Sequence, residues 1–347
     1  MSNILIVYAN FGQGHKSAAK ALEDFLNAKA YDLLDFSSNF CKKFFSYGYF
    51  FTTQKFPFLW FLIFYISKYK LVKKIIKKLN ILLANRFIKF ILEEKPKVII
   101  TTHFFPLFFL EEVKKKLNFK IITIITDIKV HSIWINKIVD LYFVPLEHTK
   151  KDLLKYKIEE DKIISGYFPF REGFLYEFKE EDLRKKFCIE NKKDCILFLL
   201  SKFDKLSTIK YAIELLKDNF NLFLIYNNNK KIKSYLDKLN YKNVIFLKFY
   251  EKIWELFFLS SVIITKPGGL TVFEGIFLKK PFIFINFIRG QEEENMDFLI
   301  EKNVAKFINN KYKLIEAINY FNDLKENLKQ NYPIQLKDIR LILKDFI

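Results

Sequence analysis

Short apolar runs alternate along the whole chain with longer amphipathic stretches. Continuous apolar strands separated by helices are typical of parallel β-sheets, because helices cover both faces of such a sheet. Ten strands suit two open, doubly wound α/β domains better than one large sheet. The ten runs are Ile4–Ala9, Val98–Thr102, Ile121–Thr126, Leu141–Val144, Ile163–Ser165, Ile196–Leu200, Leu222–Tyr226, Val244–Phe246, Val262–Thr265 and Phe282–Asn286.

The pattern loosens at residues 166–180, where Pro169 and Gly173 interrupt it. A chain of 347 residues is long enough for two domains, each with its own core. We therefore expect a Rossmann-like domain at 1–166, a second one at 167–332, and a C-terminal helix at 333–347 that packs back across the hinge. Ligands of such folds bind outside the carboxyl ends of the strands, so the expected site is a cleft between the domains.

The most informative stretch is 264–297, ITKPGGLTVFEGIFLKKPFIFINFIRGQEEENMD. It predicts a strand, a sharp turn, a helix and a second strand. Gly268 and Gly269 let backbone N–H groups approach an anion, and the helix start adds partial positive charge. Glu274, one turn further on, can accept hydrogen bonds from a sugar diol. An ordinary turn beside a solvated acidic loop is the alternative, but the complete set of glycines, acids and amides favours a ligand site.

A second glycine turn, GQGHKSAA at 12–19, directly follows the first predicted strand and opens a helix. Two glycines permit close backbone approach, although a lone G-x-G fits many nucleotide-binding folds. His15 would lie at the start of the helix and face the cleft, where an imidazole can titrate near neutral pH. A helix cap or a surface histidine is the alternative interpretation.

A third candidate region is 125–134, ITDIKVHSIW. Asp127 ends a buried strand, where a carboxylate is exposed to the cleft. Trp134 could stack on a ring or brace the loop. Asp127 and His131 have the spacing of a metal pair, but the chain has only four histidines, no Asp-x-Asp and no cysteine nearby. We therefore expect no metal and no cofactor.

The formal net charge of +19 is concentrated in residues 36–92, which hold 11 Lys and Arg, 17 aromatic residues and no acid. The longest apolar run there has 11 residues, too few for a bilayer, which needs about 20. A basic, aromatic segment of this kind is typical of contact with anionic lipids at a membrane surface. The alternatives are a solvated face over a Phe-rich core, and nucleic-acid binding, which the scarcity of Arg and the missing motif disfavour. The candidate contacts are Phe56, Phe58, Trp60, Phe61, Lys68, Lys70, Lys73 and Lys74, with His131 and Trp134 on the acceptor side.

The cysteine count and the amino end bear on the compartment. Three cysteines argue against a disulfide scaffold, and the first 15 residues lack the basic and apolar regions of a signal peptide. We expect a cytoplasmic protein, peripheral on the inner face of the cell membrane.

In this order and spacing, the motifs resemble the two-domain, family 28-like glycosyltransferases that make monogalactosyl- and glucosyl-diacylglycerol. These are relatives of the transferase that adds N-acetylglucosamine to the lipid-linked peptidoglycan precursor. The resemblance covers nearly the full length and implies the GT-B fold, two Rossmann-like domains facing a cleft. It rests on GQGHKSAA at 12–19, PKVIITTHFFP at 96–106, TDIKVHSIWINKIVDLYFVPLEHTKKDL at 126–153, ISGYFPFREGF at 164–174, TKPGGLTVFEG at 265–275 and GQEEENMDFL at 290–299.

The resemblance also implies roles for individual residues. Gly268, Gly269, Leu270 and Thr271 would bind the donor diphosphate, and Glu274 the ribose. Gln291, Glu292 and Asn295 would hold the hexose and diphosphate side. His15, with Gly14, would line the catalytic centre. Apart from the resemblance, we predict His15 as the base, and Asp127 as a second base or as the group that orients it.

The predicted activity is inverting transfer of a hexose from UDP-glucose or UDP-galactose to diacylglycerol, or to a glycosylated diacylglycerol, in glycolipid synthesis. The alternatives are N-acetylglucosaminyl transfer to a polyprenyl-linked precursor and a degenerate, non-catalytic membrane-binding member. The second alternative arises because Leu199–Lys205, where the family usually has a glycine-rich turn, contains no glycine. Donor binding should therefore depend more heavily on Gly268, Gly269 and Glu274.

Overall fold

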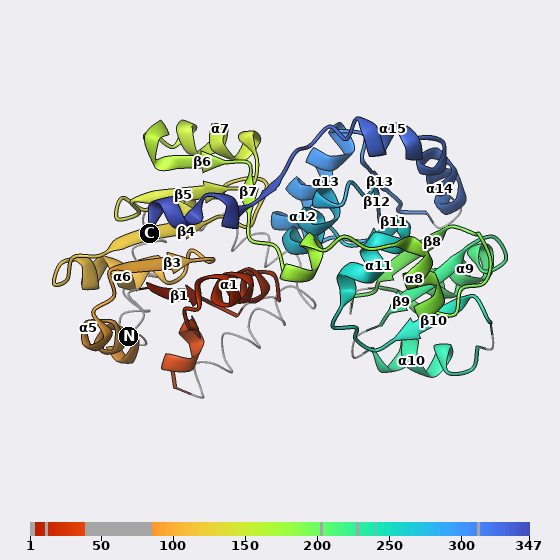
Figure 1. The fold of residues 1–347 in the computed structure, drawn as a ribbon, viewed down its shortest axis with the longest axis horizontal. Helices are drawn as coiled ribbons and strands as arrows, with labels where there is room; N and C mark the ends of the chain where they lie inside the picture. Colours follow the sequence, from red (N-terminus) through yellow and green to blue (C-terminus); the bar gives the residue numbers. More distant parts are fainter. Residues whose placement is uncertain are drawn as a thin grey trace. The chain divides into compact units, whose positions relative to one another are not determined.

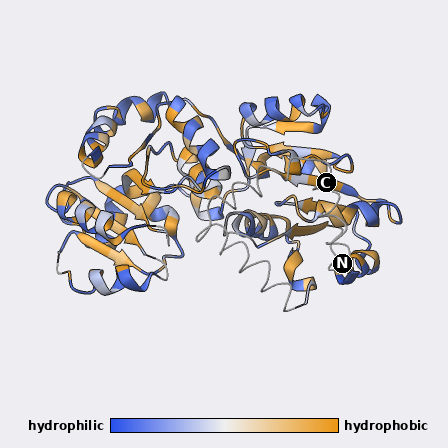
Figure 2. Cartoon of the chain, turned by 180° about the vertical axis from the view of Figure 1, so that it is seen from behind, coloured by the Kyte–Doolittle hydropathy of each residue, from blue (hydrophilic) through white to orange (hydrophobic). Residues whose placement is uncertain are grey.

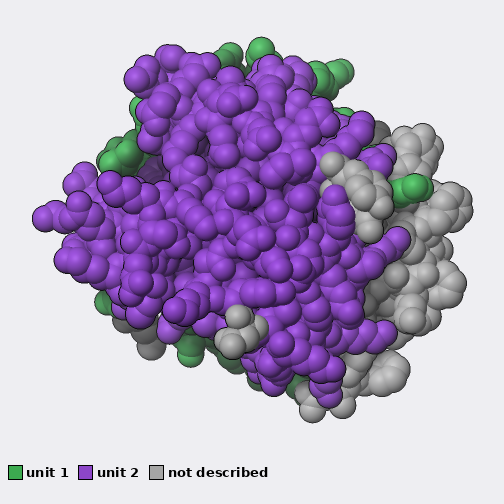
Figure 3. Space-filling model, turned by 90° about the vertical axis from the view of Figure 1, so that its right-hand side faces the viewer, with its two compact units in different colours: residues 1–171, 288–294, 336–347 green, residues 172–287, 295–335 purple. Residues whose placement is uncertain are grey.

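A computed structural model describes residues 4–10, 13–38, 85–201, 204–226, 229–239, 241–310 and 313–347. The chain divides into two compact units, coloured separately in Figure 3. Unit 1 comprises residues 1–171, 288–294 and 336–347, and unit 2 comprises 172–287 and 295–335. Residues 288–294 group with unit 1, whereas the sequence predicted one continuous second domain at 167–332.

Unit 1 contains a six-stranded, all-parallel sheet in the order β2-β1-β3-β4-β5-β6 (Figure 1). Its strands are β1 Ile4–Tyr8, β2 Ala30–Asp32, β3 Val98–Thr101, β4 Lys120–Ile124, β5 Leu141–Val144 and β6 Ile163–Ser165. Its helices and 3₁₀ turns are α1 Gln13–Leu26, η1 Leu33–Phe36, α5 Asn85–Glu94, α6 Leu107–Lys114, η2 Ser132–Trp134, α7 Glu147–Lys155 and η3 Glu160–Lys162. The chain reverses its direction of travel across the sheet between β1 and β3, which makes this the topological switch point.

Unit 2 repeats this architecture with the strand order β10-β9-β8-β11-β12-β13. Its strands are β8 Cys195–Leu199, β9 Asn221–Ile225, β10 Val244–Leu247, β11 Ser260–Thr265, β12 Phe282–Phe284 and β13 Ala305–Phe307. The remaining elements are η4 Glu172–Leu175, α8 Glu180–Lys186, α9 Leu206–Leu216, α10 Lys230–Leu236, α11 Ile253–Leu259, α12 Gly269–Phe277, α13 Gln291–Glu301, α14 Leu314–Asp323 and α15 Lys325–Gln330. The first turn of α13, residues 291–294, groups with unit 1. The switch point lies between β8 and β11.

All ten strands predicted from the apolar runs are present, within two residues at each end. Figure 2 shows why: the strands are apolar along their length, whereas the helices carry both polar and apolar residues. In unit 1, one face of the sheet packs with Phe87 of α5 and Leu110 of α6, and the other with Ala19 and Leu22 of α1. The doubly wound α/β prediction is therefore confirmed for each unit.

The C-terminal segment is not the helix expected at 333–347. It forms β14 (Lys337–Asp338), paired with β7 (Tyr167–Phe168), and then the 3₁₀ turns η6 (Ile339–Leu341) and η7 (Leu343–Phe346). Buried side chains alternate at Ile334, Leu336 and Asp338, a period of two that suits an extended chain. Ile339 and Leu343 complete the unit 1 core on the α1 face.

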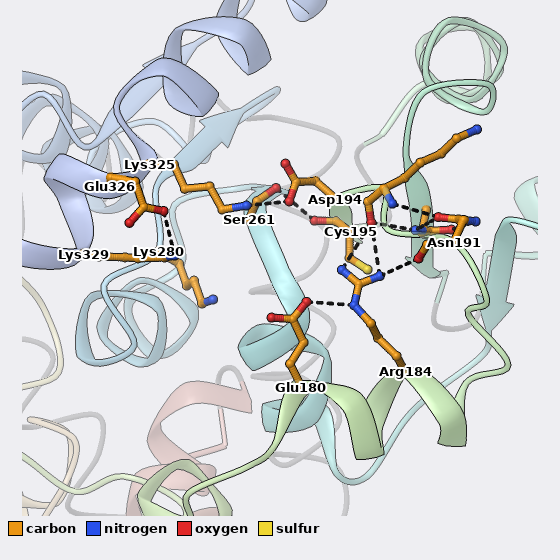
Figure 4. A network of polar contacts seen from close by, with 12 residues as sticks. Glu180, Arg184, Asn191, Asp194, Cys195, Ser261, Lys280, Lys325, Glu326 and Lys329 are labelled. Carbon is orange, nitrogen blue, oxygen red and sulfur yellow. Dashed lines mark hydrogen bonds and ion pairs between the residues drawn. The ribbon is translucent and has the colours of Figure 1, made fainter.

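A network of polar contacts lies at the amino end of strand β8 in unit 2 (Figure 4). Arg184 of α8 pairs with Glu180 at 2.7 Å and donates to the carbonyl of Lys193 at 3.3 Å. Lys325, at the start of α15, donates to Asp194 at 2.6 Å. These contacts connect α8 and α15 to the residues just before β8, at the opposite end of the strands from their carboxyl ends.

Candidate active site

The loops after β3 and β4 of unit 1 converge on His15, in the first turn of α1. His15 Nδ1 lies 2.9 Å from the carbonyl oxygen of Thr102 and 2.9 Å from Oγ1 of Thr126. Thr102 Oγ1 also donates to the backbone carbonyl of His15 at 2.9 Å. These contacts, from beyond two neighbouring strands, fix the position of the imidazole.

The contact with Thr102 also assigns the tautomer of His15. A carbonyl oxygen can only accept, so Nδ1 carries the hydrogen and the neutral ring keeps a lone pair on Nε2. Burial lowers the pKa of His15, while the charge of Asp127 and the Thr102 carbonyl oppose that shift. At neutral pH His15 is therefore a neutral imidazole able to accept a proton at Nε2.

Asp127 and Trp134 form the next part of the same cluster. Trp134 Nε1 donates to Oδ2 of Asp127 at 3.2 Å, and the Trp134 ring centroid lies 6.3 Å from that of His15. Only 1% of Trp134 is exposed, so it braces the loop and offers no ring face to an acceptor. His131 precedes η2, and its Nδ1 accepts from the backbone N–H of Ile133 at 3.2 Å.

His103 belongs to this cluster, and sequence reasoning did not select it. Its ring centroid lies 4.4 Å from that of His15, edge to face, and the side chain is only 3% exposed. Its Nδ1 accepts from the N–H of Phe105 at 3.0 Å. Burial and the neighbouring His15 hold the pKa of His103 well below its usual range, so the ring stays neutral. Its place just after the predicted strand Val98–Thr102 was the available signal.

In unit 2, strand β11 leads into the turn at residues 266–269, which the sequence predicts to bind an anion and which is called the anion turn below. Gly268 precedes α12 with φ −72° and ψ 134°, an extended conformation that any residue adopts. The backbone conformation therefore does not itself require a glycine at this position. Gly268, Gly269, Leu270 and Thr271 are all partly exposed at the start of α12, whose N–H groups are suited to an anion.

The acids and amides expected beside this turn are buried. Glu274 lies inside α12 and Asn295 inside α13, each with 1% of its surface exposed. Asn295 Nδ2 donates to the carbonyl of Pro267 at 3.0 Å, which fixes the turn. Glu292 Oε2 accepts from the N–H of Ile288 at 2.8 Å at the start of α13. The structure thus gives Glu292 and Asn295 roles in shaping the loops.

The loop after β8 contains a further polar cluster. The Asp204 carboxylate accepts from the N–H of Ser201 and from Nδ2 of Asn286, which follows β12. Burial raises the pKa of Asp204 to about 6, while the Ser201 donors and the charge of Lys266 oppose that shift. A pocket of about 160 Å³ adjoins this cluster, lined by Asp204, Lys205, Thr208, Ile285, Asn286, Ile308, Asn309 and Leu314. Sequence reasoning singled out neither Asp204 nor Asn286 as a site residue.

Two family models match the chain. Residues 15–166 match monogalactosyldiacylglycerol (MGDG) synthase, and residues 201–344 match the glycosyltransferase family 28 C-terminal domain. A processive diacylglycerol beta-glucosyltransferase from Bacillus cytotoxicus is 29% identical over 329 residues, covering 90% of this chain and 84% of the relative. The relative of the same name from Bacillus licheniformis is 27% identical over 370 residues, covering 99% and 94%. The chain belongs to the glycosyltransferase family that comprises monogalactosyldiacylglycerol synthases and processive diacylglycerol glucosyltransferases.

Solved structures show the same fold for this glycosyltransferase. MurG from Acinetobacter baumannii aligns with a TM-score of 0.60 at 11% identity, covering 100% of this chain and 99% of that one. UDP-GlcNAc 2-epimerase from Neisseria meningitidis, bound to UDP-GlcNAc, aligns with a TM-score of 0.57 at 14% identity, covering 96% and 94%. The GT-B fold implied by the resemblance is confirmed.

Several predicted contacts of the glycosyltransferase lie outside the described residues. These are Phe56, Phe58, Trp60, Phe61, Lys68, Lys70, Lys73 and Lys74, together with the side chain of Gln291. Among the residues that the structure does describe, no helix is both long and apolar enough to cross a bilayer. Within the same residues, no three His, Cys, Asp or Glu side chains gather as metal ligands.

Proposed function

We propose that the enzyme transfers a hexose from UDP-glucose or UDP-galactose to the hydroxyl of diacylglycerol, or of a glycosylated diacylglycerol, with inversion at the anomeric carbon. The names of the relatives and of the matched family models support this acceptor. The observation that carries the mechanism is the fixed tautomer of His15, which leaves Nε2 as the proton acceptor.

On the acceptor side, His15 is the general base. Its Nε2 takes the hydroxyl proton while the acceptor oxygen attacks the anomeric carbon from the face opposite the diphosphate. The new C–O bond forms as the bond to the diphosphate oxygen breaks, and UDP departs with that electron pair. Asp127, whose charge raises the pKa of His15, stabilises the imidazolium that results.

On the donor side, the start of α12 receives the diphosphate. Backbone N–H groups at Gly268–Thr271 and the positive end of the helix stabilise the negative charge of departing UDP, so this proposal needs no metal. Glu274 would hold the ribose hydroxyls, and the start of α13 would face the hexose. Asn295 contributes by holding the carbonyl of Pro267, which keeps the turn in shape.

The acceptor lipid would be reached at a membrane surface, on the inner face of the cell membrane. Support comes from the concentration of positive charge and aromatic residues in 36–92. Liposome flotation tests this part alone: binding should increase with anionic lipid and fall with salt. Binding insensitive to both would contradict the electrostatic contribution.

The deciding experiment is a donor-by-acceptor screen with liposomes that contain diacylglycerol, read by lipid chromatography of labelled product. We expect labelled glycolipid from a UDP-hexose, and almost none from the His15→Ala, Asp127→Ala double variant. His148→Ala is the matched control, because His148 is an exposed residue of α7. Unchanged activity in the double variant would end this mechanism. Product only from UDP-N-acetylglucosamine and a polyprenyl-linked acceptor would favour the alternative activity.

A further inference from the structure

We propose that Asp204 is a positioning residue for the donor, which acts by joining the loops on either side of strand β11. Ser201, Asp204 and Asn286 together are called the clasp below. The proposal rests on the donor binding proposed above at Gly268–Thr271, and it assigns a role to a loop that has no glycine of its own.

The position of the clasp follows from the sheet order. Strand β11 lies between β8 and β12. Ser201 and Asp204 follow β8, whereas Asn286 follows β12, so a contact between them passes across the end of β11. The anion turn begins at that end. A bond across this point therefore limits how far the two flanking loops can move apart around the turn.

Backbone and side-chain contacts connect both flanking strands to the end of β11. Thr265, the last residue of β11, donates through Oγ1 to the carbonyl of Leu199 at 3.4 Å. The N–H of Ile285 donates to the carbonyl of Thr265 at 3.3 Å. A shift of either loop is thus transmitted to the residue that immediately precedes Lys266, Pro267 and Gly268.

The hydrogen bonds of the clasp require a charged carboxylate. Oδ2 of Asp204 accepts from the N–H of Ser201, and Oδ1 accepts from Nδ2 of Asn286. Asn286 Nδ2 also lies 3.4 Å from Oγ of Ser201. An ionised carboxylate accepts at both oxygens, whereas protonation converts one of them into a donor that opposes an N–H group.

Burial is the main influence on the pKa of Asp204, and it is opposed by the charge of Lys266, in the turn after β11, which favours the ionised form in the clasp. The pocket of about 160 Å³ has Asp204 and Asn286 in its wall. Opening the clasp would therefore alter a wall of this pocket as well as the support of the anion turn.

The test is calorimetric binding of UDP-glucose between about pH 5 and pH 8. UDP-glucose is the probe because its diphosphate is doubly esterified and does not titrate there, unlike the terminal phosphate of free UDP. We expect wild-type affinity to weaken about tenfold as pH falls through the pKa of Asp204, about 6, since protonation removes a charge-assisted hydrogen bond.

Two variants separate position from charge. Asp204→Asn should bind about tenfold more weakly at pH 8 and lose the pH dependence, because its amide cannot accept at both atoms. Asn286→Ala keeps the carboxylate but removes its partner, and should also weaken binding. In turnover assays both should raise the donor KM more than they change kcat. Asp237→Asn is the matched control, since Asp237 is an exposed acid paired with Lys233 in the same unit.

The outcomes are distinguishable. A flat wild-type profile, or Asp204→Asn and Asn286→Ala that bind like wild type, would overturn the clasp while leaving the proposed function intact. Tighter binding by Asp204→Asn with Asn286→Ala unchanged would also overturn it, and would show that the carboxylate simply repels the diphosphate. No saturable binding by wild type at any pH would overturn the proposed donor site itself. If Asp204→Asn fails to fold, Asn286→Ala and the wild-type profile still decide.

Discussion

Unit 1 and unit 2 have the same sheet architecture, but they place groups of opposite titration behaviour at the carboxyl ends of their strands. In unit 1, burial lowers the pKa of His15 and of His103. In unit 2, burial raises the pKa of Asp204 to about 6. The physical cause is the same, because a low-dielectric environment disfavours whichever form is charged. One unit thus maintains a neutral base, and the other has an acid that titrates just below neutral pH.

The two units also differ in what supports the candidate ligand site. In unit 1 the carbonyl of Thr102 and the hydroxyl of Thr126 hold the side chain that would react, and the hydroxyl of Thr102 holds the backbone of the same residue. In unit 2 the side chains of Asn295 and Asp204 hold backbone that would bind. The difference suggests that unit 1 affects the chemical step and unit 2 affects donor affinity, and the following substitutions test that division.

The largest effect is expected for His15→Gln. Glutamine is of similar length but provides no base, so kcat should fall by about 10²–10⁴, the usual contribution of general base catalysis. The donor KM should change much less, because the groups expected to bind the diphosphate and the ribose, Gly268–Thr271 and Glu274, belong to unit 2. Steady-state kinetics with varied donor measures both values. A loss below about tenfold in kcat would contradict the role of His15 as base.

Asn295→Ala is the variant expected to change the donor KM rather than kcat. It leaves the carbonyl of Pro267 without its amide donor, and an unsatisfied buried acceptor costs about 1–3 kcal/mol. We expect the donor KM to rise about tenfold with a much smaller change in kcat. Asn327→Ala, on the exposed surface of α15, is the control and should leave both values unchanged. A kcat effect as large as that of His15→Gln would break the division between the units.

Sequence alone located both candidate regions, because strand, turn and helix follow one another locally. His15, Asp127 and Gly268 each lie just beyond an apolar run that predicts a buried strand. The strands missed in the two sheets, β2 and β13, are three-residue edge strands with mixed sequences, Ala-Tyr-Asp and Ala-Lys-Phe. Their mixed sequences lack the continuous apolar run that identified the other strands, including the opposite edge strands β6 and β10.

The residues that sequence reasoning missed owe their importance to distant partners. Asn286 meets Asp204 across 82 residues of chain, and Thr102, which the sequence did not single out, meets His15 across 87. Neither pairing has a local pattern, because it depends on which strands become neighbours in the sheet. The expected C-terminal helix was wrong for a related reason: β14 exists because it pairs with β7, about 170 residues earlier.

A smaller effect concerns the pH dependence of kcat. Because the folded-state pKa of His15 lies below 6.5, kcat should stay high as pH falls to that value and decline only below it, when the base becomes protonated. Asp127→Asn removes the charge that raises this pKa, so the acidic limb should move to still lower pH. Measurement at saturating donor separates this limb from the titration of Asp204. A limb that moves to higher pH in Asp127→Asn would contradict the assignment.

The smallest effect is expected for the Lys325–Asp194 pair (Figure 4), because Asp194 directly precedes β8 and the candidate site lies beyond the other end of that strand. The two atoms are 2.6 Å apart, but the side chains are 37% and 32% exposed. Solvent screens such a pair, so Lys325→Ala should lower the free energy of unfolding by about 1 kcal/mol or less. Asp194→Asn and the double variant complete a cycle in chemical denaturation, with kcat and donor KM unchanged in all three. A change in donor KM would mean that the amino and carboxyl ends of these strands are coupled. The residues at the carboxyl ends would then not determine donor binding alone.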